Sequence, residues 1–166
     1  MVRAPQTRVY LSLGSNLGDR RANLKRALRE LAQTPGLTIS SASRVYRSAP
    51  AEVTDQPEFL NLAAEARTSL PPCDLLQAVK RIERELGRPD RSGRWGPRVI
   101  DIDLLLYDGV QMETPELTLP HPRMWGRGFV LAPLAEIAPQ LTMPDGRRVT
   151  DIADAMAQEQ DVSADL

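Results

Sequence analysis

Two aspartates, Asp101 and Asp103, stand inside the apolar run VIDIDLLLY, which otherwise predicts a buried β-strand. A carboxylate buried without a partner is strongly destabilising, so a cation should lie nearby. Because side chains alternate along a strand, both carboxylates should point to one face of the sheet, with Cα atoms about 6.5–7 Å apart. Mg²⁺ prefers carboxylate oxygens and is commonly shared with substrate phosphates. The pair therefore predicts a Mg²⁺ site, although two solvated acids on a wet sheet face would show the same pattern.

Basic side chains gather on both sides of this acidic pair. They are Arg88, Arg91, Arg94 and Arg98 before it, and His121, Arg123 and Arg127 after it. Arginine suits bidentate contacts with phosphate, and phosphoryl-type transfer needs a metal together with cations that stabilise developing charge. His121 is the single histidine, and phosphate contact and an incidental position are both open for it. The chain lacks both the P-loop lysine motif and the glycine loop of protein kinases, which excludes those two enzyme classes.

The composition is that of an ordinary globular protein. The chain has 166 residues, 42% hydrophobic and 26% charged, with a net charge of −1, so an anion site must come from a local cluster. The one cysteine, Cys73, allows neither an internal disulfide nor a cysteine metal cage, and we interpret it as incidental. We find no apolar leader and no run of 18 apolar residues, so we expect a cytoplasmic protein without a membrane span.

Hydrophobic periodicity predicts the elements that must position these groups. Strands are expected over residues 8–13, 37–48, 60–68 and 99–107, and helices over 19–33 and 69–87. Asp19 and Ser69 are the expected helix N-caps. The order β-α-β-β-α-β is typical of a ferredoxin-like split βαβ core, an α+β fold in which helices pack on an antiparallel sheet. We expect one domain over residues 1–166, with its core at about 8–145.

Several finer expectations follow from the same pattern. The strand over 60–68 should have one wet face, and Asp108-Gly109 should turn the chain into a hairpin with residues 110–113. Opposite the two aspartates, the side chains expected to enter the core are Ile100, Ile102, Leu104 and Leu106. Residues 129–138 should be helical despite Pro133, with extra C-terminal strands and a short helix after them. The acidic tail over 151–166 should be partly frayed.

The sequence also resembles a known family. The motifs YLSLGSNLGDR, VYRSAP, DQPEFLNLA, IERELGR, RWGPRVIDIDLLLYDG, LPHPRM and GRGFVLAPLAEIAP are similar to those of the 6-hydroxymethyl-7,8-dihydropterin pyrophosphokinases of folate biosynthesis. The resemblance covers most of residues 8–145. It implies that ATP, as co-substrate, donates pyrophosphate to the hydroxymethyl group of the pterin and leaves as AMP. It also implies two Mg²⁺ ions and small-molecule substrates. Separately, we expect a monomer.

The resemblance assigns a role to each matching residue. The catalytic group would be Arg88, Arg98, Asp101, Asp103, His121 and Arg127, in which the two aspartates hold the metal ions and the others contact phosphates. The pterin would lie against Ser48, Ala49, Pro50, Ala51, Phe59, Asn61 and Phe129. The nucleotide would lie near Lys80, Glu83, Arg91, Trp95, Leu104, Leu117 and Thr118, besides Arg88, Arg98, His121 and Arg127.

The residue types themselves agree with the pterin roles. Aromatic faces suit a flat ring, with about 0.5–1.5 kcal/mol for each offset stack, and the amide of Asn61 can donate to and accept from a lactam edge. Plain core packing remains an alternative for Phe59 and Phe129, as hinge packing does for Trp95. We expect direct in-line attack on the β-phosphorus without a covalent enzyme intermediate, and no residue is identified as a general base.

A nucleic-acid binder is the rival interpretation, since split βαβ sheets also bind single-stranded RNA. That function requires aromatic and basic residues interleaved on the central strands, whereas the central strand here carries two acids. A regulator that has lost catalytic residues is a further alternative, but the metal and phosphate residues are all present. We therefore expect no nucleic-acid partner and no membrane partner.

Overall fold

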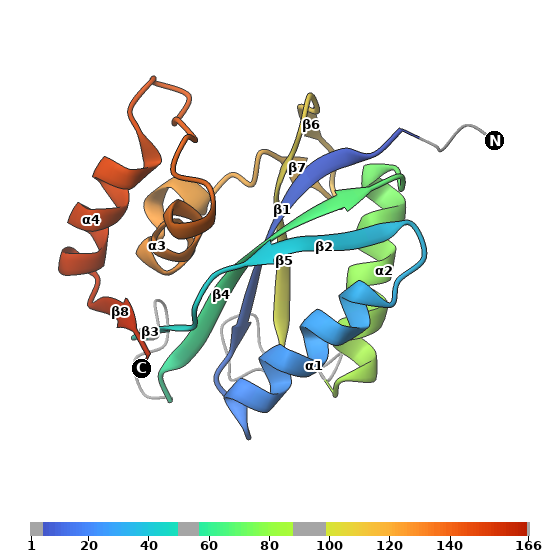
Figure 1. Ribbon diagram of the computed structural model, residues 1–166, viewed down its shortest axis with the longest axis horizontal. Coiled ribbons are helices and arrows are strands. Elements are labelled where there is room, and N and C mark those ends of the chain that lie inside the picture. The colour runs from blue at the N-terminus through green and yellow to red at the C-terminus, as the bar shows by residue number, and fades with distance from the viewer. Residues whose placement is uncertain (1–4, 50–56, 88–98, 166) are drawn as a thin grey trace.

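The computed structural model describes residues 5–49, 57–87 and 99–165. Its strands are β1 (Thr7–Ser15), β2 (Leu37–Ala42), β3 (Tyr46–Ser48), β4 (Phe59–Thr68), β5 (Asp101–Tyr107), β6 (Met112–Glu113), β7 (Thr118–Leu119) and β8 (Val162–Ala164). Its helices are α1 (Arg20–Ala32), α2 (Pro72–Glu85), α3 (Gly128–Ile137) and α4 (Val149–Glu159), with a 3-10 turn, η1, over Met124–Gly126. Figure 1 shows one twisted sheet with a pair of helices on each side.

The main sheet is antiparallel, with the strand order β5-β1-β4-β3-β8, and β2 also pairs with β4. The part formed by β5, β1, β4 and β2, with α1 and α2 as crossovers, has the ferredoxin-like order and confirms the predicted α+β fold. The single strand expected over residues 37–48 is divided in two. β2 pairs with the end of β4 and β3 with its beginning, so β3 is free to carry a different neighbour, β8.

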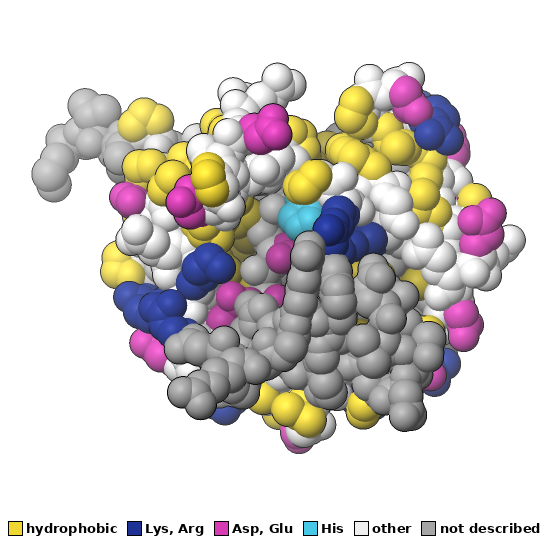
Figure 2. Space-filling model, turned by 180° about the vertical axis from the view of Figure 1, so that it is seen from behind, with side chains coloured by type: hydrophobic (Ala, Val, Ile, Leu, Met, Phe, Trp, Pro, Cys, Tyr) yellow, Lys and Arg dark blue, Asp and Glu magenta, His cyan; other side chains and the backbone are white. Residues whose placement is uncertain are grey.

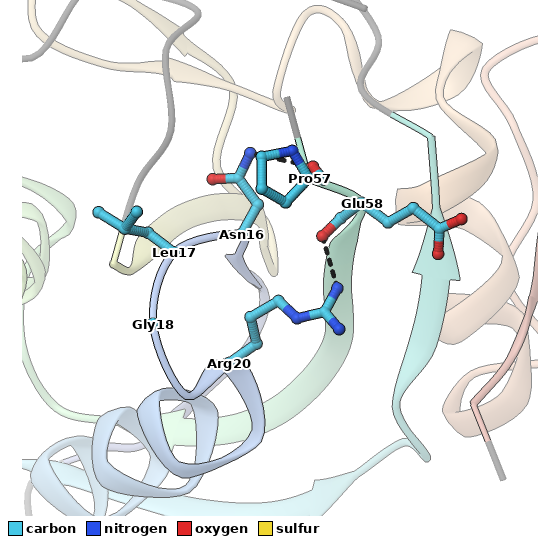
Figure 3. Close-up of a pocket in the computed structure, with 6 residues that line it drawn as sticks. All are labelled: Asn16, Leu17, Gly18, Arg20, Pro57 and Glu58. Atoms are coloured by element: carbon cyan, nitrogen blue, oxygen red, sulfur yellow. Dashed lines mark hydrogen bonds between the residues drawn. The ribbon is translucent and has the colours of Figure 1, made fainter. Parts of the chain in front are cut away.

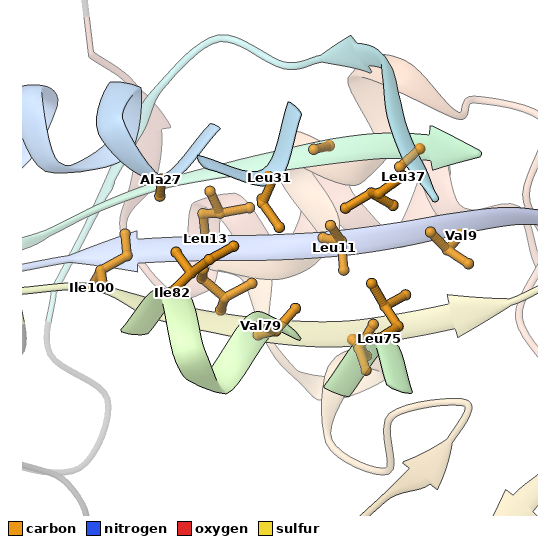
Figure 4. Packing of buried hydrophobic residues seen from close by; sticks show 14 of the residues in the cluster. Val9, Leu11, Leu13, Ala27, Leu31, Leu37, Leu75, Val79, Ile82 and Ile100 are labelled. Atoms are coloured by element: carbon orange, nitrogen blue, oxygen red, sulfur yellow. The ribbon is translucent and has the colours of Figure 1, made fainter. Parts of the chain in front are cut away.

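α1 and α2 cover one face of the sheet and bury the residues that their periodicity predicts (Figure 4). These are Leu24, Ala27 and Leu31 of α1 and Leu75, Val79 and Ile82 of α2, each at most 1% exposed. Asp19 caps α1 as expected, since its side chain accepts a hydrogen bond from Ala22 N at 3.1 Å. Ser69 does not cap α2, because the helix begins later, with Pro71 at the N-cap position and Pro72 in the first turn.

The other face of the sheet is also covered over the first half of β4, so the expected wet face is wrong at Asn61 and Ala63, while Arg67 is exposed as expected. α3 and α4 pack there on a second apolar cluster that includes Tyr10, Ala63 and Leu105 (Figure 1). The sequence signal was misleading because the side chains that β4 presents to this cluster are small or polar. Alanine at position 63 lets α3 approach the sheet closely, and α3 itself is apolar around most of its circumference.

An irregularity in β5 overturns another expectation. Leu11 pairs with Leu104 and Tyr10 with Leu106, so Leu105 is an extra residue in the ladder. A bulge of this kind reverses which face the following side chains occupy. Ile100, Ile102 and Leu104 therefore join the cluster beneath α1 and α2 as predicted, whereas Leu106 packs on the opposite side.

The expected hairpin after β5 is not formed. Gly109 has a φ of +75°, and Val110 N donates to Tyr107 O at 3.0 Å, so the turn itself is present. However, β6 pairs with β7 in a separate small sheet and not with β5. β7 is followed by a cis peptide bond between Leu119 and Pro120.

The C-terminal part is more ordered than a frayed tail. After α3 the chain forms the predicted short helix, α4, but it then continues into β8, which pairs with β3. Two contacts hold this end: Asp165 N donates to Val45 O at 2.8 Å, and Arg21 binds the Asp165 carboxylate at 2.6 Å. No helix in the described parts of the chain is long and apolar enough to cross a membrane.

Candidate active site

The strand register brings most of the predicted site residues onto one face of the sheet. Asp101 of β5 lies opposite Gly14 of β1, which lies opposite Asn61 of β4. Directly opposite residues on antiparallel strands share a face, as do residues two positions apart on one strand. Asp103, Phe59 and Ser48 therefore lie on this same face, the one that α3 partly covers. The acidic residues occupy one end of the row and the pterin-side residues the other.

Gly14, in the middle of the row, was missed by the sequence reasoning. A Cβ atom at this position would lie 2.9 Å from Asn61 Oδ1 and 3.6 Å from Phe59 Cδ1. The missing side chain therefore allows the amide of Asn61 to lie over β1, between the two ends of the row. The signal in the sequence was the change from alternating residues to glycine at the end of β1.

Two of the residues predicted to hold the pterin, Asn61 and Ser48, contact each other through buried polar groups. Asn61 and Ser48 are 2% and 4% exposed, and Asn61 Nδ2 donates to Ser48 Oγ at 2.7 Å. Phe59 is half-buried at the start of β4, and Ala49 is exposed just after β3. The predicted pterin residues Pro50 and Ala51 lie outside the described residues.

The start of β4 is anchored by the loop that joins β1 to α1 (Figure 3). Asn16 Nδ2 donates to Pro57 O at 3.3 Å, and Arg20 donates to Glu58 O at 2.7 Å. With Leu17 and Gly18, these residues line a cavity of about 400 Å³ directly before Phe59. The GSNLGD turn thus holds the residues that precede Phe59.

Most of the described residues predicted to lie near the nucleotide, though not Arg127, line a second cavity, of about 320 Å³, beside the aspartates. Of the predicted residues it contains Lys80, Glu83, Asp101, Asp103, Leu104, Leu117, Thr118 and His121. Its wall also includes residues that the sequence did not indicate, among them Leu76, Thr114 and Glu116. Thr114 and Leu117 close this wall as a turn, since the Thr114 hydroxyl bonds both the N–H and the carbonyl of Leu117 at 3.0 Å.

Glu83 is the most deeply buried carboxylate of this cavity, at 4% exposure. Its Oε2 accepts a hydrogen bond from Ile102 N at 3.0 Å, between the two aspartates of β5. This bond satisfies an otherwise unpaired backbone donor at the edge of the sheet and ties α2 to the strand that carries both acids.

His121 lies in the hollow at the centre of the face in Figure 2, with basic and acidic side chains beside it. Burial, followed by the positive charges of Arg127 and Arg123, lowers the pKa of its imidazole from 6.5 to about 4, against the opposing effect of Asp101. Its Nδ1 accepts a hydrogen bond from Arg123 N at 3.1 Å. The ring is therefore neutral at physiological pH, and its proton is on Nε2, where it can donate to a ligand oxygen.

Arg127 and Phe129 stand at the start of α3. The Arg127 guanidinium carbon is 5.5 Å from the centre of the Phe129 ring, which is a cation–π contact. Arg127 also acts on the charge state of His121, so the three predicted residues form one group.

The acidic pair fits a Mg²⁺ site that is completed by a ligand. Within the described residues, no group of three or more His, Cys, Asp or Glu side chains is arranged to hold a metal ion. Mg²⁺ is commonly bound by one or two carboxylates, with substrate phosphates and water filling the other positions. Two half-buried carboxylates next to a cavity match that donor set. The predicted residues Arg88, Arg91, Trp95 and Arg98 lie outside the described residues.

Comparison with known proteins identifies the family. Residues 10–139 match the family model of 7,8-dihydro-6-hydroxymethylpterin-pyrophosphokinase (HPPK). The chain belongs to the HPPK family. It is 48% identical over 132 residues to a 2-amino-4-hydroxy-6-hydroxymethyldihydropteridine pyrophosphokinase of Bacillus subtilis, covering 80% of this chain and 78% of that protein. It is 51% identical over 137 residues to the Methylorubrum extorquens enzyme of the same name, covering 82% and 86%.

Solved HPPK structures share the fold. The chain is similar to an HPPK-DHPS protein in complex with substrates, with a TM-score of 0.71 and 13% identity over 93% of this chain and 44% of that one. It is also similar to Plasmodium falciparum HPPK-DHPS with pteroate, with a TM-score of 0.72 and 14% identity over 96% and 44%. The chain thus spans less than half of these solved chains. The HPPK family carries out the pyrophosphokinase step of folate biosynthesis.

Proposed function

We propose that this HPPK chain transfers pyrophosphate from ATP to the hydroxymethyl group of 6-hydroxymethyl-7,8-dihydropterin and releases AMP. The observation that carries the proposal is the row on the sheet, in which Gly14 separates the aspartates from Asn61 and Phe59. A flat ring held by Asn61 and Phe59 would direct a substituent across Gly14 toward phosphates held beside Asp101 and Asp103. The proposal includes one domain over residues 1–166 that acts as a cytoplasmic monomer.

The proposed role of the acidic pair is to hold two Mg²⁺ ions together with the triphosphate. When bound, Mg²⁺ would offset the negative charge of the phosphates. Asp101 and Asp103 supply carboxylate oxygens from one sheet face, and Glu83 holds the strand between them. His121 donates from Nε2, and Arg127 contributes a permanent positive charge to the same phosphates.

The proposed reaction is a single displacement at the β-phosphorus. The hydroxymethyl oxygen forms a bond to that phosphorus, while the bond from the same phosphorus to the oxygen bridging to the α-phosphate breaks. AMP leaves with the bridging oxygen, and the hydroxyl proton passes to solvent. Asn61 orients the lactam edge, and Phe59 and Phe129 contact the ring faces, so positioning and charge stabilisation supply the rate.

The decisive experiment is to identify the nucleotide product. The purified chain should release AMP from ATP only when the hydroxymethyl pterin and Mg²⁺ are both present. Release of ADP would indicate transfer of a single phosphoryl group, and AMP release without pterin would indicate hydrolysis. Either result would overturn the proposal. Size-exclusion chromatography and cell fractionation test the proposed monomer and its location.

A further inference from the structure

Gln160, the first residue after α4, makes two hydrogen bonds to the backbone where η1 ends and α3 begins. Its Oε1 accepts from Gly128 N at 2.8 Å, and its Nε2 donates to Gly126 O at 3.1 Å. These two backbone groups stand on either side of Arg127. One side-chain amide therefore fixes both peptide units that flank this arginine, two residues before Phe129.

The bond to Gly128 fills a specific need of α3. The first N–H groups of a helix have no partner within the helix and are normally satisfied by a capping side chain. The N-cap residue of α3 is Arg127, and its side chain makes no capping hydrogen bond. Gln160 supplies the missing acceptor from outside the helix, so the cap of α3 comes from a residue more than thirty positions later in the chain.

The backbone around this contact is closely packed. A Cβ atom at position 128 would lie 3.1 Å from both Gln160 Oε1 and Met156 O. Met156 O also accepts from Gln160 N at 2.8 Å, which closes the last turn of α4. The following residue, Asp161, has a φ of +54°, a left-handed conformation that ends the helix and directs the chain into β8. The position of Gln160 is thus determined by the backbone on both sides.

The same short segment also contacts the other wall of the site. Val162 of β8 pairs with Ser48 of β3, whose hydroxyl accepts the hydrogen bond from Asn61. Residues 160–162 therefore link the start of α3 to the strand that carries the pterin-side serine. This segment lies beyond residues 10–139, the part of the chain that matches the family model.

We propose that Gln160 is a positioning residue, which holds Arg127 and Phe129 in the geometry required to bind phosphate and pterin. This inference rests on the proposed function for the roles of those two residues. Gln160 itself touches no substrate. It acts through the backbone of Gly126 and Gly128.

The primary test compares Gln160→Ala with Gln158→Ala. Gln158 is an exposed glutamine on the same helix, and no hydrogen bond of its side chain is seen within the described residues, so the control removes the same amide without the contact. Gln160→Ala should raise the Kd for the pterin about five- to tenfold and lower kcat/KM by a similar factor, the scale of losing one or two hydrogen bonds. Gln158→Ala should match the wild type.

Amide hydrogen exchange tests the positioning independently of catalysis. Gly128 N–H should exchange faster in the free Gln160→Ala protein than in the wild type, while amides of the central strand β1 stay unchanged. Gln160→Glu should retain the protection of Gly128, because a carboxylate still accepts, but should lose the bond to Gly126 O. Unchanged exchange at Gly128 in Gln160→Ala would overturn the positioning role whatever the activity.

A double-mutant cycle separates positioning from general stability. If Gln160 acts through Phe129, adding Gln160→Ala to Phe129→Ala should weaken pterin binding by less than about twofold. The inference would be refuted if Gln160→Ala weakened pterin binding as much in the Phe129→Ala protein as in the wild type. It would also be refuted if Gln160→Ala lowered the Tm and left the pterin Kd unchanged. A wild-type chain that releases no AMP would refute the proposed function instead, and the exchange result would still decide whether Gln160 holds α3.

Discussion

Asn61 and Ser48 are joined across β4 and β3 by a buried 2.7 Å hydrogen bond from amide Nδ2 to hydroxyl oxygen. An amide has two N–H donors and a carbonyl acceptor, so this bond uses one donor and fixes the plane of the others. The carbonyl oxygen of Asn61 lies over Gly14, since a Cβ atom at that position would be 2.9 Å from it. The donor and acceptor that a lactam edge requires are thus oriented before any ligand arrives, which reduces the entropy lost on binding.

The Gly14→Ala substitution should impair the pterin side of the site alone. Its Cβ would come within 2.9 Å of Asn61 Oδ1, so the amide must move or rotate out of its bond with Ser48. We expect a pterin Kd at least about tenfold weaker, because a misplaced buried amide costs on the order of 1–3 kcal/mol. Calorimetry with the pterin and with a non-hydrolysable ATP analogue measures both affinities. Equal weakening for the two ligands would point to a disturbed sheet instead.

The Asp101→Asn and Asp103→Asn substitutions should each nearly abolish turnover while the fold survives. Each removes one negative charge from the proposed metal site and keeps the size of the side chain. Removal of Mg²⁺ with a chelator should have the same effect on the wild type. Turnover at saturating Mg²⁺ and circular dichroism check the prediction. A variant that kept more than about a tenth of the activity would contradict the metal role, because its activation free energy would have risen by less than ~1.4 kcal/mol.

Phe129→Ala should weaken pterin binding far more than ATP binding. The ring is proposed to stack on the pterin and also lies beside the Arg127 guanidinium, at 5.5 Å. Loss of one stack should cost about 0.5–1.5 kcal/mol beyond the lost apolar contact. Phe129→Leu is the matched control, because it keeps the apolar volume and removes the flat face. If the leucine variant bound pterin as well as the wild type, stacking would not be the reason for a phenylalanine here.

His121 should titrate near pH 4 instead of 6.5, because burial and the nearby Arg127 and Arg123 lower the pKa of its imidazole. As the single histidine, it gives an assigned NMR signal without further variants. Between pH 6.5 and 4 the unfolded chain binds a proton at this residue that the folded chain does not, so this group destabilises the fold as pH falls through that window. Arg127→Ala should move the midpoint upward. A midpoint near 6.5 in the wild type would contradict the neutral imidazole.

Glu136 should make the stability of the fold depend on pH. Burial opposes its ionisation, but hydrogen bonds from Tyr46 at 2.7 Å and from Arg44 at 2.8 Å outweigh that effect and lower the pKa of the carboxyl. The contribution of Glu136 to the free energy of unfolding is therefore complete at pH values above its ordinary pKa of 4.5. This contribution is lost as the pH falls through the lower pKa of the folded state. In urea unfolding from pH 3 to 7, Glu136→Gln should flatten this dependence, and Glu113→Gln, at an exposed position of β6, should not.

The sequence was sufficient to predict the ferredoxin-like core, because the periodicity of α1 and α2 and the strand patterns are local signals. It was misleading for the other face of the sheet. Ala63 of β4 was expected on a wet face, and nothing local to β4 indicates that α3 returns to cover it. The same limit applies to β8, since three residues after a helix carry no signal of the edge that they will pair with.

The candidate site shows the same division. The chemistry of Asp101 and Asp103 follows from residue type and strand alternation, and the family resemblance added Asn61 and the remaining assignments. Gly14 and Gln160 could not be predicted, because their importance lies in what they contact: an amide oxygen on the neighbouring strand and two backbone groups on another helix. Leu106 was assigned to the wrong face of the sheet because the extra residue Leu105 shifts the alternation of side chains between the two faces. The residue types of the strand give no sign of such a bulge.

The pairing of β8 with β3 also has a consequence for the order of events during synthesis. More than one hundred residues separate Ser48 from its partner Val162, and a ribosome adds about 5–20 residues per second. β3 therefore waits on the order of ten seconds with an unpaired edge after it emerges, while β1, β4 and β5 can already assemble. A nascent chain in this interval is a target for chaperones or for pairing with another nascent chain, and a premature stop codon after α3 would leave that edge permanently exposed.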